Sequence, residues 1–353
     1  MDNLINHNAT SPEEEESVEF PWRQITIAVT FAIIMIVGLI GNALVIIIAC
    51  KKPVAARSST GIFILNLSLS DLLFLLFCSP FTATVLTMKY WIFGRLLCKL
   101  WNFVIQSSML ASIYTLVILS FDRYFKLVRK PSNRLGNKWG IIIVVFIWIV
   151  AAGFSSPCLI VFDITQVNNT SKFLCYDSLW TDPARQKPRY LLFVAMVGYV
   201  VPLMLLTFTY ASIMKATWKV SNIGSSNCVK RSRKQVTVII SVLVLAFGVS
   251  WLPHNIFNVW IALAKDKFPW TQFTFRFKVI SWCLTSLHTC LNPVVYCLMS
   301  RLFRHAAKEV VTECGKGDCS MPGVTYERQI PAHPCHTLSR LSARYKHRPL
   351  FYI

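Results

Sequence analysis

Polar side chains interrupt several long apolar stretches of this sequence, and Asp71 is the most informative of them. A carboxylate among apolar residues needs a cation, a proton or several hydrogen-bond donors as partners. Ser112, Thr289 and Asn292 can complete an oxygen cage around Asp71 that suits a small hard cation such as Na⁺. A neutral network of hydrogen bonds between packed side chains also explains these residues. The sequence leaves both interpretations open.

Asp122, Arg123 and Tyr124 follow one another near the end of another apolar stretch. An arginine that faces the interior of a bundle must be paired, and Asp122 can hold Arg123, as a latch does, until another acceptor arrives. An arginine that extends its charge toward water from a helix end is the simpler alternative. Pro253 and Pro293 lie inside apolar stretches beside polar residues, and they predict helix kinks that can act as hinges.

Catalytic chemistry finds no support in the residue pattern. The apolar stretches contain no Ser/His/Asp set, and the Cys and His residues near the C-terminus are too irregularly spaced for a zinc site. We therefore expect a protein that is not an enzyme and requires no cofactor, with Na⁺ as an allosteric ion.

The composition indicates a membrane protein. Hydrophobic residues make up 54% of the 353 residues and charged residues 15%, whereas about a quarter of a soluble domain is charged. The net charge of +20 would suggest a nucleic-acid partner in a soluble protein, but in so apolar a chain it indicates membrane topology. We expect membrane lipids, and no nucleic acid, among its partners.

Seven apolar stretches are long enough to cross a bilayer, which requires about 20 residues. They are too long and too continuously apolar for barrel strands, so each must be a helix whose backbone groups bond internally. The sequence therefore predicts an all-α membrane protein, a seven-transmembrane helical bundle over residues 25–299. The expected spans are 25–50, 60–88, 96–126, 138–161, 189–219, 232–264 and 273–299.

Basic residues predict the orientation, because Lys and Arg concentrate in cytoplasmic loops. They gather in the first, third and fifth loops between the spans, which places the tail 1–24 outside the cell and the C-terminus inside. Asn8, Asn168 and Asn169 begin N-x-Ser/Thr sequences in segments expected outside, and they are candidate glycosylation sites. We expect a multi-pass protein of the plasma membrane.

The segment after the last span has its own pattern. Residues 300–313 carry apolar side chains at helical spacing with basic residues between them, which predicts a short amphipathic helix on the cytoplasmic membrane surface. Cys314 ends this segment and is a candidate for palmitoylation. Residues 314–353 are polar and basic, and we expect a disordered cytoplasmic tail.

In this order and in these spans, the motifs resemble those of the rhodopsin-like (class A) G-protein-coupled receptors over roughly residues 25–314. The motifs are Gly41–Asn42, Leu65–Asn66–Leu67–Ser68–Leu69–Ser70–Asp71, Trp91–Ile92–Phe93–Gly94 ahead of Cys98, Asp122–Arg123–Tyr124, Trp148, Pro202 with Tyr210, Trp251–Leu252–Pro253 and Asn292–Pro293–Val294–Val295–Tyr296.

The resemblance implies roles for particular residues. Cys98 and Cys175 correspond to the external disulfide of that family, and Ile113, Pro202 and Phe247 correspond to a packing triad under the ligand pocket.

The resemblance also implies a switch. A ligand would favour an outward swing of the sixth span about Pro253, so that Arg123 leaves Asp122 for Tyr210 or a helix of the G protein while Tyr296 turns inward.

Residues that are absent narrow the class of ligand. Ile105 occupies the position where amine receptors carry an aspartate, and Ser286 occupies that of the retinal-binding lysine of opsins. The N-terminal tail has no cysteine, unlike that of chemokine receptors. A wide polar and aromatic pocket remains, which suits a peptide. Its expected residues are Gln106, Trp251, His254, Asn255, Asn258, Lys278 and Trp282, with Phe81 and Trp91 near the rim.

The sequences Trp251–Leu252–Pro253–His254 and Lys234–Gln235–Val236–Thr237 are similar to those of galanin and allatostatin-type receptors and their orphan relatives. This similarity implies a neuropeptide ligand, a heterotrimeric G protein of the Gi/o type, and arrestin. A G protein of the Gq type, a neuropeptide Y-like or other short peptide, and a transporter function are the alternatives. The acidic residues 13–16 either attract a basic peptide or form only a solvated tail.

Overall fold

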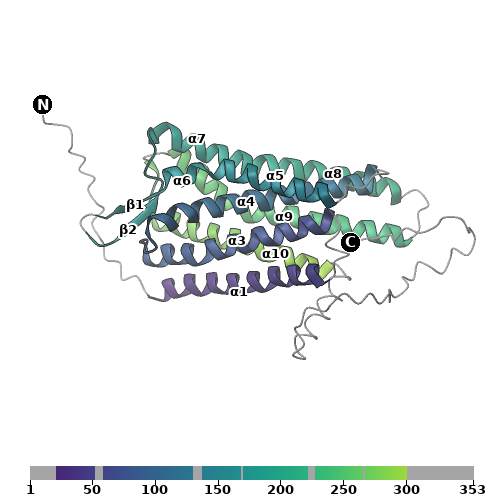
Figure 1. The fold of residues 1–353 in the computed structure, drawn as a ribbon, viewed down its shortest axis with the longest axis horizontal. Helices are drawn as coiled ribbons and strands as arrows, with labels where there is room; N and C mark the ends of the chain where they lie inside the picture. Colours follow the sequence, from purple (N-terminus) through teal and green to yellow (C-terminus); the bar gives the residue numbers. More distant parts are fainter. Residues whose placement is uncertain are drawn as a thin grey trace, which may run out of the picture.

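Long apolar helices dominate the computed structural model, which describes residues 21–51, 59–129, 137–167, 170–221, 227–264 and 267–299. The helices run side by side along the long axis of the molecule (Figure 1). They are α1 (Pro21–Lys51), α3 (Ser59–Met88), α4 (Gly94–Tyr124), α5 (Asn137–Ser155), α6 (Pro157–Val161), α7 (Pro183–Ala195), α8 (Val201–Ser221), α9 (Asn227–Ala264) and α10 (Gln272–Met299).

Two short π-helical turns continue these helices. The turn η1 (Phe125–Arg129) extends α4, and η2 (Met196–Val200) joins α7 to α8. Because α6 follows α5 closely and η2 connects α7 with α8, the described helices form seven consecutive segments. The predicted seven-helix bundle is confirmed.

Six of these segments are long and apolar enough to cross a membrane by length and composition. The seventh, α10, has 28 residues and packs against α9, α1 and α3. Its polar residues, among them His288 and Asn292, lower its hydropathy. The helix that looks least like a membrane span therefore still brings many polar groups into the bundle.

The outer surface of the bundle is apolar. On α5, the side chains of Ile141, Ile142, Phe146 and Ile149 are each more than half exposed. Water would disfavour so large an apolar surface, whereas lipid accommodates it. The chain is a multi-pass membrane protein, and its helices bury their polar residues toward one another.

Glycine lets α1 approach its neighbours closely. A Cβ atom added to Gly41 would lie 3.0 Å from the Cβ of Pro293, and one added to Gly38 would lie 2.5 Å from a methyl group of Leu75. Both positions are therefore matched to the surfaces of α10 and α3.

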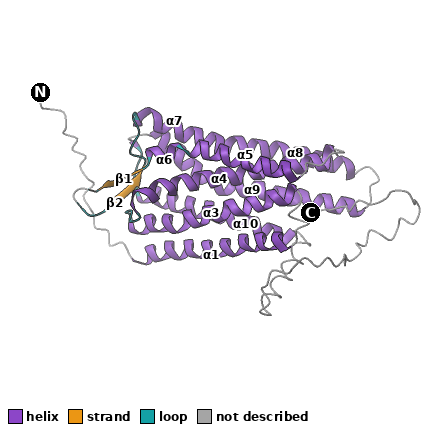
Figure 2. Cartoon of the chain, viewed as in Figure 1, coloured by secondary structure: helices purple, strands orange, loops and turns teal. Residues whose placement is uncertain are grey.

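A small antiparallel hairpin lies at one end of the bundle and packs against α4 (Figure 2). Its strands are β1 (Asp163–Gln166) and β2 (Phe173–Tyr176), with Ile164 opposite Cys175. The sequence did not predict these strands. The candidate modification sites Asn8, Asn168, Asn169 and Cys314, the expected helix 300–313 and the tail 314–353 lie outside the described residues.

Candidate functional site

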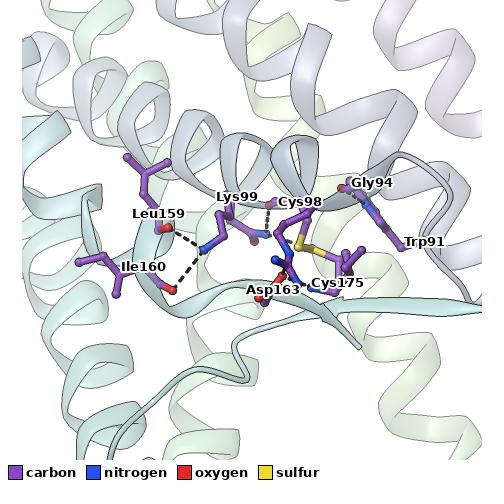
Figure 3. Close-up of a disulfide and its surroundings, with 11 residues drawn as sticks. Trp91, Gly94, Cys98, Lys99, Leu159, Ile160, Asp163 and Cys175 are labelled. Carbon is purple, nitrogen blue, oxygen red and sulfur yellow. Dashed lines mark hydrogen bonds and ion pairs between the residues drawn. A yellow bond between two sulfur atoms is a disulfide. The ribbon is translucent and has the colours of Figure 1, made fainter. Parts of the chain in front are cut away.

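Cys98 and Cys175 form a disulfide with an S–S distance of 2.01 Å (Figure 3). Cys98 lies in the first turns of α4 and Cys175 in β2. The predicted pairing is confirmed, and it ties the hairpin to the end of the bundle.

Two basic side chains near the disulfide bind the segment that contains α6 and β1, and Figure 3 shows the contacts of Lys99. Lys99 donates hydrogen bonds to the carbonyl oxygens of Leu159 and Ile160 at 3.0 and 3.4 Å, at the end of α6. Arg95 pairs with Asp163 of β1 at 2.7 Å. The hairpin is thus held at several points over the bundle.

Trp91 is buried within an aromatic cluster. Its backbone N–H donates to the carbonyl of Phe173 at 2.6 Å, and its ring stacks on Trp101 with centroids 5.1 Å apart. Phe81 lies at 5.8 Å from the Trp91 ring. The two residues expected near the pocket rim therefore contact each other, and Trp91 also anchors the hairpin.

Several residues of the predicted pocket come together between α9 and α10. The Asn258 Nδ2 and His254 Nε2 atoms lie 3.0 Å apart in hydrogen-bond contact. The His254 ring contacts Trp282 at 4.8 Å and Trp251 at 5.9 Å between centroids. The Asn255 side chain instead donates to the Trp251 carbonyl of its own helix at 2.9 Å.

Gln106 and Lys278 are the remaining residues of the predicted ligand pocket. Gln106 lies on α4, two turns after the disulfide, and Lys278 lies on α10, one turn before Trp282. The Lys278 ammonium is close enough to the His254 ring to interact with it electrostatically.

Asp71 is buried in the middle of the bundle and accepts hydrogen bonds from two predicted neighbours. Asn292 Nδ2 donates to one carboxylate oxygen at 2.7 Å, and Ser112 Oγ donates to the other at 3.2 Å. The Thr289 hydroxyl donates to the Ser286 carbonyl of its own helix at 2.7 Å. Asp71, Ser112 and Asn292 therefore belong both to a hydrogen-bond network and to the predicted oxygen cage for Na⁺.

A small internal cavity lies beside this carboxylate, with room for about one water-sized group. Thr289 lines the same cavity, and the buried Nδ1 atom of His288 has no hydrogen-bond partner among the described residues. The lining residues are Asp71, Phe74, Ser108, Met109, Ser112, Ile113, Phe247, Trp251, His288 and Thr289.

An aromatic column connects this cavity with the predicted pocket. The Phe247 ring lies 6.4 Å from Trp251 and 5.9 Å from His288, and Phe74 lies 5.9 Å from Trp251. Ile113 and Phe247 are both buried in the main hydrophobic core, and Pro202 is buried on α8.

Pro293 leaves a backbone carbonyl without its donor, and another helix satisfies that carbonyl. Pro293 has no N–H for the carbonyl of Thr289, and Asn42 of α1 donates to that oxygen at 3.0 Å. In α9, the Tyr199 hydroxyl donates at 2.8 Å to the carbonyl of Gly248, which lies one residue before Val249, whose carbonyl loses its donor at Pro253. Side chains of neighbouring segments thus bond to the backbone near both prolines.

Asp122 is buried at the other end of α4 and has more partners than the sequence indicated. Lys126, one turn later, reaches its carboxylate at 2.7 Å, and Thr60 and Ser59 of α3 donate to it at 2.9 and 3.4 Å. Lys126 is thus a cation in direct contact with Asp122, in addition to Arg123, which the sequence predicts as its partner. The i,i+4 spacing of Asp122 and Lys126 was the signal that could have identified this pair.

The remaining switch residues lie near this end of the bundle. Arg123 and Tyr210 are half-buried on α4 and α8, and the Tyr124 ring contacts Phe125 at 5.5 Å. Tyr296 lies in the last turn of α10, and its side chain is outside the described part of the structure.

Comparison with known proteins gives consistent results. The family model described as 7 transmembrane receptor (rhodopsin family) matches residues 41–296. Galanin receptor type 1 of Homo sapiens is 34% identical over 317 residues, covering 87% of this chain and 89% of that receptor. Galanin receptor 2b of Danio rerio is 31% identical over 304 residues, covering 84% and 77%. Galanin receptor type 2 of Mus musculus is 34% identical over 291 residues, covering 79% and 74%.

Proposed function

Because the chain belongs to the rhodopsin family of seven-transmembrane receptors, we propose that it binds an extracellular neuropeptide of the galanin type and activates a heterotrimeric G protein. The family and these relatives make it a peptide receptor that couples to G proteins, and not an enzyme. The identity of the peptide and the subtype of the G protein are the proposed parts.

The aromatic column carries this proposal. It runs from Trp282 and His254 at the predicted pocket, through Trp251 and Phe247, to the cavity beside Asp71. A ligand that changes the packing of His254 or Trp251 would change contacts deep in the bundle. This contiguity supports a function in which binding at one end of the bundle biases its conformation.

At the other end of the bundle, Arg123 would be the residue that responds to this conformational change. The sixth span, α9, would swing about Pro253, and Arg123 would move toward Tyr210 or the G protein. The Asp122 carboxylate would keep Lys126 as a partner in both states. A ligand would shift the equilibrium only by its difference in affinity for the two states.

The same proposal includes Na⁺ as an allosteric ion beside Asp71. The oxygen atoms around the cavity fit such an ion. They belong to the Asp71 carboxylate and to the hydroxyls of Ser112 and Thr289 on the cavity wall. The Asn292 Oδ1 atom is also buried, without a partner among the described residues. The ion would supply a positive charge that favours one conformation. Asn292 would have to turn its amide N–H away from Asp71 to offer that oxygen.

The charge pattern of the loops supports the proposed orientation, and the similarity to galanin receptors supports the proposed intracellular partners. The N-terminal tail would lie outside the plasma membrane, the G protein would be of the Gi/o type, and arrestin would bind the same cytoplasmic end. Similarity to galanin receptors supports the Gi/o type, and a Gq type is the alternative.

The test is G-protein dissociation in cells that express the full chain. Synthetic galanin, a neuropeptide Y-type peptide and a scrambled galanin of the same composition are applied to cells with and without the receptor. Activation by galanin at lower concentration than by the other two supports the proposal. Activation only by the neuropeptide Y-type peptide, or by none of them, contradicts the galanin assignment.

A further inference from the structure

Lys278 is a cation in the predicted pocket, and the described residues provide it with no counter-charge. Its side chain is half-buried on α10, one turn from Trp282, and it faces His254 closely enough to interact electrostatically. Within the described ranges, its ammonium group makes no hydrogen bond or ion pair. An ammonium withdrawn from water is stabilised by an anion or several acceptors.

The carboxylates nearby are already paired. At the end of the bundle that holds the hairpin, the described acidic residues are Asp163, Asp177 and Asp182. They pair with Arg95 at 2.7 Å, Lys187 at 2.9 Å and Arg185 at 3.8 Å, in that order. The described part of this end therefore offers no spare carboxylate to Lys278.

Two buried donors on α4 are also without partners among the described residues. The Gln106 Nε2 and Trp101 Nε1 atoms are buried and donate no hydrogen bond within the described residues. Buried polar atoms are normally hydrogen-bonded, so each such atom calls for an explanation. This end of the bundle has donors in excess and needs acceptors from elsewhere.

We propose that the peptide recognised by this receptor carries a carboxylate that pairs with Lys278 beside His254. The inference rests on the proposed function, because it takes the ligand to be a peptide. The carboxylate comes either from an Asp or Glu side chain or from a free C-terminus, and both present the same chemistry to the ammonium. This differs from the expectation that an acidic tail selects a basic peptide.

The test compares four pools of synthetic 12-residue peptides. Two pools contain Asp and Glu, and two contain Asn and Gln at the same positions. One pool of each pair has a free C-terminus and the other an amidated one. G-protein dissociation is measured in cells that express the full-length receptor at matched surface levels. The variants are Lys278→Met, the conservative Lys278→Arg, and Arg276→Met, which removes an exposed cation of the same helix.

If a carboxylate of the peptide pairs with Lys278, the pools that carry that carboxylate should activate the receptor at a concentration roughly tenfold lower than the pools in which the same group is neutral. Lys278→Met should remove this preference, whereas Lys278→Arg and Arg276→Met should retain it. A preference that follows the side chains assigns an acidic residue, and one that follows the C-terminus assigns the terminal carboxylate.

Other outcomes overturn the inference in distinguishable ways. Equal potency of the charged and neutral pools contradicts the proposed carboxylate pairing but not the proposed peptide function. A preference for the charged pools that persists in Lys278→Met has the same meaning. A preference that emerges only when Glu13, Glu14, Glu15, Glu16 and Glu19 are changed to Gln shows that the receptor's own tail occupies Lys278. No response to any pool contradicts the proposed peptide function as well.

Discussion

Asp71 keeps two hydrogen-bond donors, Ser112 and Asn292, on its two oxygen atoms in the middle of the bundle. The sequence identified these three residues because carboxylates and amides are rare in apolar spans. It did not show that the Thr289 hydroxyl turns back to its own helix. Such a local choice depends on competition between nearby acceptors, which residue spacing does not resolve.

Replacing Asp71 with Asn tests the proposed ion. If Na⁺ favours the inactive conformation, added NaCl should lower the affinity of a peptide agonist for the wild-type receptor several-fold, because the ion shifts the population. Asp71→Asn should abolish this effect. Agonist binding is measured in NaCl and in choline chloride at constant ionic strength. An effect of the same size in the mutant would show that the ion acts elsewhere.

Lys126 offers a second prediction at the scale of single residues. Removing its ammonium with Lys126→Met takes away a cation that competes with Arg123 for the Asp122 carboxylate, so Asp122 should hold Arg123 more tightly. Lys126 is partly exposed, so we expect an effect of about 1 kcal/mol, seen as a several-fold fall in basal G-protein activation. Lys126→Arg is the control and should stay near the wild-type level. A rise in basal activation in Lys126→Met would contradict this role.

At the scale of helices, composition predicted most of the architecture. Seven apolar stretches became seven helical segments, because backbone groups in lipid must bond within a helix. The hairpin β1–β2 was not predictable in the same way, since its eight residues are stabilised by the disulfide at Cys175 and by Trp91 from a distant loop. Contacts between helices, such as that of Asn42 with the Thr289 carbonyl, also require spatial information.

The pairing of Asn42 with the kink in α10 is testable by a double-mutant cycle. Asn42→Ala leaves the carbonyl of Thr289 without its donor, which should lower the stability of the purified receptor by about 1 kcal/mol. In a Pro293→Ala background, the restored backbone N–H can serve that carbonyl, so the same change should cost less. Thermal unfolding in detergent gives both values. Equal costs in the two backgrounds would contradict the role given to Asn42.

Gly41 sets how closely α1 approaches α10. Gly41→Ala would place a methyl group 3.0 Å from the Pro293 ring, which cannot rotate away, so we expect a loss of about 1 to 3 kcal/mol in stability. Gly153→Ala is the matched control, because an added Cβ there meets nothing within 4 Å. Thermal unfolding of both variants is compared with that of the wild type. Equal stability of the two variants would mean that the helices separate without cost.

For the whole molecule, the two ends of the bundle have different chemistry. One end has the hairpin fixed by the Cys98–Cys175 disulfide and the paired rings of His254 and Trp282, and the other buries Asp122 beside Arg123. The aromatic column of Trp251 and Phe247 lies between them. The layout is that of a receptor of this family, and in the proposed switch a ligand at one end would change the partner of Arg123 at the other.

The most direct test measures peptide binding and G-protein activation together in two variants at matched surface expression. Arg123→Ala should bind the activating peptide with nearly unchanged affinity but fail to activate the G protein, because it lacks the charge that the inner end presents. Asp122→Asn should raise basal activation, because it weakens the hold on Arg123. Normal activation by Arg123→Ala would contradict the proposed switch even though the fold is correct.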